Sequence, residues 1–142
     1  MQTTTTTTTE APHVRTGRTR ALSVAGAALA AALAWFVEVH VLLIHLTFRF
    51  GAGPAQTVAI GEVIGVSLAA SLLGWLLLAL LERRTADARR PWVITALAVL
   101  AASLALPLTA GTTTSAVAGL IALHVTVGVV VIPALARTAR GR

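Results

Sequence analysis

The sequence contains no cysteine, lysine or tyrosine, and only five acidic residues among its 142. The absence of cysteine excludes disulfides, thiol catalysis and thiolate metal sites. Charged residues make up 11% of the chain, against about 25% in soluble globular domains. A chain this short keeps much of its surface exposed, so its 56% of hydrophobic residues cannot all be buried in a water-soluble core. A soluble enzyme is therefore a poor interpretation, and an integral membrane protein is favoured.

The few charges are strongly biased towards arginine, and the formal net charge is +6. In a soluble protein this bias would indicate nucleic-acid binding. Here the arginines flank apolar segments and lack interleaved aromatic residues, so we expect no nucleic-acid partner. Anionic lipid headgroups are the expected partner of these side chains. The positions predicted to face the headgroups on the cytoplasmic side are Arg83, Arg84, Arg89 and Arg90.

Long apolar stretches divide the chain. Residues 1–20 include seven consecutive threonines and no apolar face, which predicts a disordered cytoplasmic tail. Residues 21–138 are predicted to form a transmembrane domain, and residues 139–142 a basic C-terminal tail. About 20 helical residues span the hydrocarbon core, and no alternating pattern favours strands. The predicted fold is all-α, a four-helix transmembrane bundle with helices at about 21–46, 57–81, 92–110 and 115–135.

The arginines also predict the orientation. If the chain crosses the membrane four times, ten arginines lie on one side and Arg49 alone lies on the other. Positively charged loops remain cytoplasmic. We therefore expect a multi-pass protein of a bacterial plasma membrane with both termini in the cytoplasm.

Small residues in the first two predicted helices indicate helix packing, because helices in lipid associate through close backbone approach. Gly61 and Gly65 form a GxxxG motif, and Ala25, Ala28 and Ala32 lie along one stripe. Packing within the chain is the favoured interpretation. A homo-oligomer or an unidentified membrane protein partner is the alternative.

Ionisable residues inside the apolar stretches are the candidate functional residues, because a charge near mid-bilayer costs about 2.5–3.5 kcal/mol. At 1.5 Å per helical residue, Glu38 and His124 lie at similar depths, ~12–13 Å from the outer end of the bundle. They form a candidate pair, either structural or part of a relay. His45 and Glu62 lie nearer the outer surface and complete a candidate polar cluster.

Three functions are open for this cluster. The favoured one is structural, in a non-enzymatic membrane component or subunit. The second is proton- or ion-coupled transport through an oligomer, with Glu38 and His124 as the relay. The third is a metal site built from the cluster, although no compact ligand motif occurs. No catalytic residue and no cofactor is predicted.

The chain resembles a family through six short stretches, which leave out the threonine-rich tail. They are GPAQTV (53–58), GW (74–75), LLERRT (80–85), ARRPW (88–92), LHV (123–125) and IPALAR (132–137). The family consists of small actinobacterial four-helix membrane proteins known as domain of unknown function 6069, and the resemblance covers roughly residues 21–138. It implies the architecture, a bacterial plasma membrane and an actinobacterial origin, and it implies no activity. Of the ionisable positions, His124 and the Glu82-Arg83-Arg84 turn match the family pattern.

Overall fold

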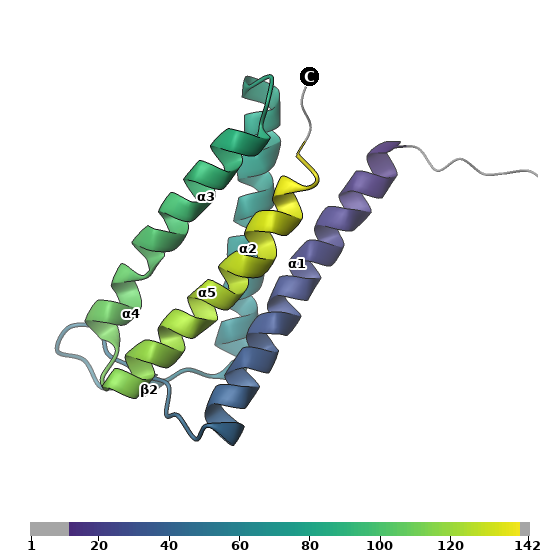
Figure 1. The fold of residues 1–142 in the computed structure, drawn as a ribbon. Helices are drawn as coiled ribbons and strands as arrows, with labels where there is room; N and C mark the ends of the chain where they lie inside the picture. The colour runs from purple at the N-terminus through teal and green to yellow at the C-terminus, as the bar shows by residue number, and fades with distance from the viewer. Residues whose placement is uncertain (1–11, 140–142) are drawn as a thin grey trace, which may run out of the picture.

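Four helical segments stand side by side in the computed structural model, which describes residues 12–139 (Figure 1). All four are long and apolar enough to cross a membrane: Thr16–Val41, Ile60–Arg84, Arg89–Ala110 and Thr114–Ala136. Both ends of the described chain and the α2–α3 connection lie at one end of the bundle. The predicted four-helix transmembrane fold is confirmed.

The elements run in the order α1 (Pro12–Phe36), η1 (Val37–Val41), β1 (Thr47–Phe48), β2 (Gln56–Thr57), α2 (Ile60–Arg84), α3 (Arg89–Ser103), α4 (Ala105–Ala110) and α5 (Thr114–Ala136). Strands β1 and β2 pair antiparallel, with Thr47 opposite Thr57. Thr113 caps the start of α5, because its hydroxyl accepts a hydrogen bond from the Ala116 amide at 3.1 Å. That bond satisfies one of the free amides at the helix start.

Helix α5 is the centre of the bundle and contacts α1, α2, α3 and α4. Two glycines let neighbouring side chains approach its backbone. A Cβ at Gly119 would lie 2.5 Å from Leu46 Cδ2, and one at Gly128 would lie 2.7 Å from Leu100 Cδ2. Close approach of this kind holds helices together in lipid.

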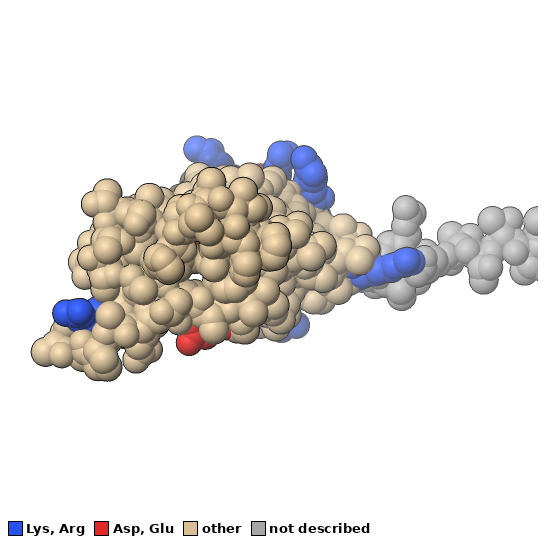
Figure 2. Space-filling model, turned by 90° about the horizontal axis from the view of Figure 1, so that it is seen from below, with Lys and Arg blue, Asp and Glu red and all other residues tan. Residues whose placement is uncertain are grey.

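The outer surface of the bundle is apolar. Leu29 on α1, Leu76 on α2 and Val99 on α3 are each at least 60% exposed. Most of the surface seen from the end that carries β1 and β2 is formed by residues other than Arg, Asp and Glu (Figure 2). In a bilayer the exposed apolar side chains along the helices face lipid tails, which explains the composition that a soluble fold could not accommodate.

The first helix differs from the predicted range 21–46 at both ends. It begins at Pro12, so residues 12–20 are helical where a disordered tail was expected. Buried Arg20 contacts α2 and the end of α5, which anchors this segment. At the other end the helix passes into the π-helical turn η1, and Leu43 has a positive φ of 53°. Residues 42–46, apolar except for His45, are not helical, which hydropathy alone does not reveal. Residues 1–11 of the predicted tail and 140–142 of the C-terminal tail lie outside the described residues.

The third membrane segment is interrupted between α3 and α4, where a single helix over 92–110 was predicted. The break falls at Leu104, three residues before Pro107. Proline has no amide to bond the carbonyl four residues earlier, here that of Ser103, and its ring crowds that carbonyl. The interruption is the expected consequence.

The predicted small-residue contacts are only partly present. Ala28 is buried and Ala32 is partly buried, but Ala25 is exposed, and the most buried alanines of α1 are Ala27 and Ala31. Gly61 and Gly65 are exposed, and a Cβ at either would meet nothing within 4 Å. A side chain at either glycine of the GxxxG motif would therefore meet no other described residue. The favoured interpretation of that motif is wrong because the α2 face that packs inward carries Val63, Ser67, Ser71 and Leu78.

Candidate functional site

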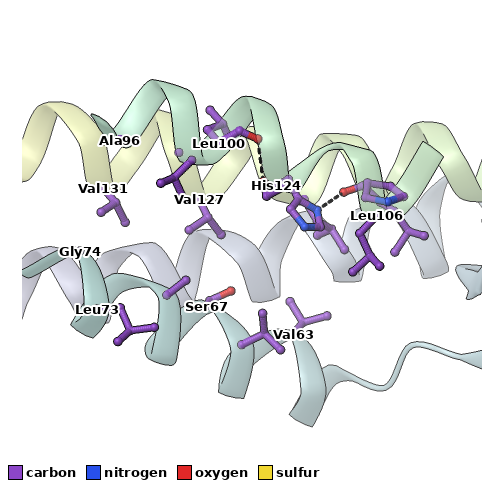
Figure 3. Close-up of a pocket in the computed structure, with 18 of the residues that line it drawn as sticks. Val63, Ser67, Leu73, Gly74, Ala96, Leu100, Leu106, His124, Val127 and Val131 are labelled. Carbon is purple, nitrogen blue, oxygen red and sulfur yellow. Dashed lines mark hydrogen bonds between the residues drawn. The ribbon is translucent and has the colours of Figure 1, made fainter. Parts of the chain in front are cut away.

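A pocket of about 730 Å³ lies between α2, α3, α4 and α5 (Figure 3). Its wall is apolar apart from four polar residues: Glu62, Ser67, Ser103 and His124. Ligand pockets typically measure about 300–1,000 Å³ and combine apolar walls with a few polar groups. This pocket has that size and composition.

The pocket opens sideways, towards the surface that would face lipid. Val66 and Leu73 on α2 are 65% and 64% exposed, and Val99 on α3 is 60% exposed, yet all three line the pocket. The end of the bundle that carries both ends of the described chain is called the terminal end. The pocket wall on that side includes Trp92, whose indole lies 3.1 Å from a Cβ built on Gly74. At the opposite end, Phe48, Phe50 and Glu62 complete the lining.

His124 presents a usable polar atom at the pocket. Its Nδ1 lies 2.7 Å from the Leu120 carbonyl oxygen. A carbonyl can only accept, so Nδ1 carries the hydrogen in this bond, and Nε2 of the neutral ring remains an acceptor. The Ser103 hydroxyl donates to Leu100 O at 2.7 Å. Ser67 reaches the pocket from α2 (Figure 3), and its hydroxyl makes no hydrogen bond within residues 12–139.

Glu38 does not line this pocket and lies in η1, next to α5. Its side chain is buried, and its Oε2 has no hydrogen-bond partner among the described residues. A Cβ at Gly119 would lie 3.2 Å from that oxygen, so the glycine provides the space for the carboxyl group. Gly119 and His124 are five residues apart on α5, which turns them about 140° from each other around the helix axis. Glu38 and His124 form no hydrogen bond with each other, so the predicted pair does not form.

The remaining members of the predicted polar cluster are also dispersed. His45 is exposed in the loop after η1 and does not line the pocket. Glu62 is exposed at the start of α2, where its Oε2 accepts a hydrogen bond from the Ala59 amide at 3.0 Å. Only Glu62 and His124 line the same pocket. Within residues 12–139, no group of three or more His, Cys, Asp or Glu side chains could hold a metal ion.

A polar cluster that the sequence analysis missed lies at the terminal end of the bundle. Arg20 is buried and binds Glu82 through two hydrogen bonds, Nη2 to Oε1 at 2.5 Å and Nη1 to Oε2 at 3.2 Å. Its Nη2 also donates to the Thr138 carbonyl at 2.9 Å, and its Nε donates to the Thr138 hydroxyl at 3.0 Å. One guanidinium thus connects α1, α2 and the residues after α5. The sequence feature that could have indicated this cluster was the Glu82 carboxylate near the end of an apolar stretch.

The predicted headgroup-facing arginines are all exposed. Arg83 and Arg84 end α2, and Arg89 and Arg90 begin α3. Their exposure at one end of the bundle is compatible with contact to lipid headgroups.

Comparison with known proteins identifies the chain at the level of a family. No curated protein and no solved structure matches it. The model of a family of unknown function, DUF6069, matches residues 11–141, and the chain belongs to that family.

Proposed function

We propose that this protein is a non-enzymatic membrane component that holds the hydrocarbon chain of a lipid in the pocket between α2, α3, α4 and α5. The observation that carries the proposal is the apolar pocket itself, of about 730 Å³ and open towards the lipid-facing surface. The molecules that surround such an opening in a bilayer are lipid chains. Apolar contacts with the wall hold the chain, and His124 Nε2 accepts a hydrogen bond from a hydroxyl or amide on the ligand.

The polar groups of the pocket favour binding over catalysis. Ser67 and His124 form no hydrogen bond with each other, so the described residues do not place a nucleophile against a base. The relay alternative receives no support from the contacts, because Glu38 and His124 face different sides of α5. A single binding pocket accounts for the arrangement without a proton path.

Photolabelling tests this function. The probe is a diacylglycerol with a diazirine at the end of one acyl chain, irradiated with the purified protein, and the labelled peptides are mapped by mass spectrometry. We expect labels on lining residues of α2 and α3. The Ala96→Trp substitution places an indole at the pocket wall and is expected to lower labelling there about tenfold, equivalent to ~1.4 kcal/mol of binding.

The matched control is Ala98→Trp, two residues along α3, at an exposed position that does not line the pocket. It adds the same side chain to the same helix and should leave labelling unchanged. Equal labelling of both variants, or labels spread evenly over the lipid-facing surface, would contradict the proposal. A protein that is dimeric in native mass spectrometry and carries no lipid label would assign the pocket to a second copy of the chain.

The same proposal places the protein in a bacterial plasma membrane with both termini in the cytoplasm. The described arginines support it: Arg49 lies in the loop between β1 and β2 and the others lie at the terminal end. The positive-inside rule assigns that terminal end to the cytoplasm.

The absence of cysteine allows a direct test of orientation. Single Ala52→Cys and Ala86→Cys variants place one thiol in the β1–β2 loop and one in the α2–α3 loop, both at exposed positions. A membrane-impermeant maleimide should label Ala52→Cys in intact cells, and Ala86→Cys only after permeabilisation. The reverse pattern would place the termini outside.

A further inference from the structure

The end of the pocket near the β1–β2 loop carries an acidic group. Glu62 lines the pocket and is exposed. Its Oε2 accepts the Ala59 amide hydrogen at 3.0 Å, and its other carboxylate oxygen makes no hydrogen bond with a described residue. A carboxylate oxygen at the rim of an apolar pocket is an acceptor for a cationic group that carries N–H hydrogens.

A basic group lies beside the same end. Arg49 lines a second hollow, of about 320 Å³, together with Gly51 and residues 109–112. The two hollows adjoin, because Ala110 lines both, and Phe48 and Phe50 on either side of Arg49 line the apolar pocket. The Arg49 guanidinium makes no ion pair or hydrogen bond within the described part of the chain.

Arg49 is the charged group in the second hollow that is able to donate to an anion. The Thr109 hydroxyl donates to Ala105 O at 2.8 Å, and the Thr112 hydroxyl is shared with the hydroxyl and carbonyl of Thr47. The Gly111 and Thr112 amides donate to Pro107 O and Thr47 O. A guanidinium presents paired N–H donors that match two oxygens of a phosphate.

We infer that the lipid in the pocket is a phospholipid with a primary ammonium on its headgroup, an inference that rests on the proposed function. One acyl chain lies in the apolar pocket, the phosphate binds Arg49, and the ammonium donates to Glu62. A headgroup that carries a phosphate but no cation offers the Glu62 carboxylate no cationic partner. A choline headgroup has no N–H to donate to that carboxylate.

Four lipids with identical acyl chains test the inference by native mass spectrometry of the detergent-solubilised protein: phosphatidylethanolamine, phosphatidylglycerol, phosphatidylcholine and diacylglycerol. We expect phosphatidylethanolamine to bind most tightly. Glu62→Gln should remove its preference over phosphatidylglycerol. Arg49→Gln should weaken the binding of both phosphatidylethanolamine and phosphatidylglycerol about tenfold, which is the lower range for the loss of a hydrogen bond to a charged group. It should leave the binding of diacylglycerol unchanged. His45→Gln, exposed at the same end of the bundle and outside the lining of both hollows, is the control and should change none of them.

The headgroup series on the unaltered protein keeps the test independent of how the variants fold. Equal binding of all four lipids, or stronger binding of phosphatidylglycerol or phosphatidylcholine than of phosphatidylethanolamine, overturns the inference and leaves the proposed pocket intact. Binding of none of them, diacylglycerol included, overturns the proposed function. Glycerophosphoethanolamine without chains should not compete. If it displaces phosphatidylethanolamine at equal concentration, the headgroup alone is the ligand and the inference is wrong.

Discussion

Replacing Arg20 with methionine is expected to lower the free energy of unfolding by about 3–5 kcal/mol, the usual loss when one partner of a buried ion pair is removed. The Arg20 side chain is 6% exposed and that of Glu82 is 17% exposed. The substitution removes both hydrogen bonds to Glu82 and both to Thr138, and these bonds connect three parts of the bundle. Unfolding in mixed micelles, followed by tryptophan fluorescence, measures the loss.

Two further variants distinguish the ion pair from a general effect of charge. Arg18→Met removes an exposed arginine two residues away and should change stability by no more than about 0.5 kcal/mol, as surface substitutions usually do. The double variant Arg20→Met, Glu82→Leu should recover much of the loss, because replacing both members leaves no buried charge without its partner. If Arg18→Met and Arg20→Met are equally destabilising, the contacts of Arg20 do not hold the bundle together.

The four membrane segments were predictable because each is a long apolar run, and that property is local. Helix α2 was predicted at 57–81 and runs from Ile60 to Arg84, and α5 was predicted at 115–135 and runs from Thr114 to Ala136. The prediction of the first segment was less accurate, because four of the five residues 42–46 are as apolar as the helix before them. A bilayer or a buried core accommodates apolar side chains in any backbone conformation, provided that the backbone amides are hydrogen-bonded. The Ile44 amide, for example, donates to Glu38 O at 2.8 Å.

The candidate site could not be predicted in the same way, because it depends on contacts between helices, which no local sequence pattern specifies. Residue number predicted similar depths for Glu38 and His124, but Glu38 lies beside Gly119, five residues or about 7.5 Å along α5 from His124. Contact between two side chains also depends on the rotation of each helix. That rotation comes from packing, in which Gly119 faces Glu38 while His124 faces the pocket. The pocket itself arises from the spacing of α2 and α3, which no pattern in either helix specifies. Arg20 was counted with the flanking arginines because nothing in its neighbours indicates burial.

Replacing Gly111 with alanine is the second substitution with a large expected effect. Its backbone, with φ −64° and ψ 133°, is open to any residue, so the glycine is required for space. An added Cβ would lie 2.4 Å from Val117 Cγ2 and 2.9 Å from the Pro107 carbonyl oxygen. The carbonyl belongs to the last turn of α4 and accepts the Gly111 amide at 3.1 Å, so it cannot move without loss of that bond. Overpacking of this kind costs about 1–3 kcal/mol, measurable by the same unfolding assay.

Gly65→Ala is the matched control, because it adds the same methyl group where nothing lies within 4 Å. Alanine is favoured over glycine inside a helix by about 0.8–1.0 kcal/mol, so this variant should be as stable as the parent or more so. The comparison also tests the homo-oligomer alternative for the GxxxG motif, since Gly61 and Gly65 face outward on α2. If Gly65→Ala converts a dimer to a monomer in native mass spectrometry, the exposed motif is an interface between copies. If the mass is unchanged while Gly111→Ala is destabilised, close packing is confined to the glycines inside the bundle.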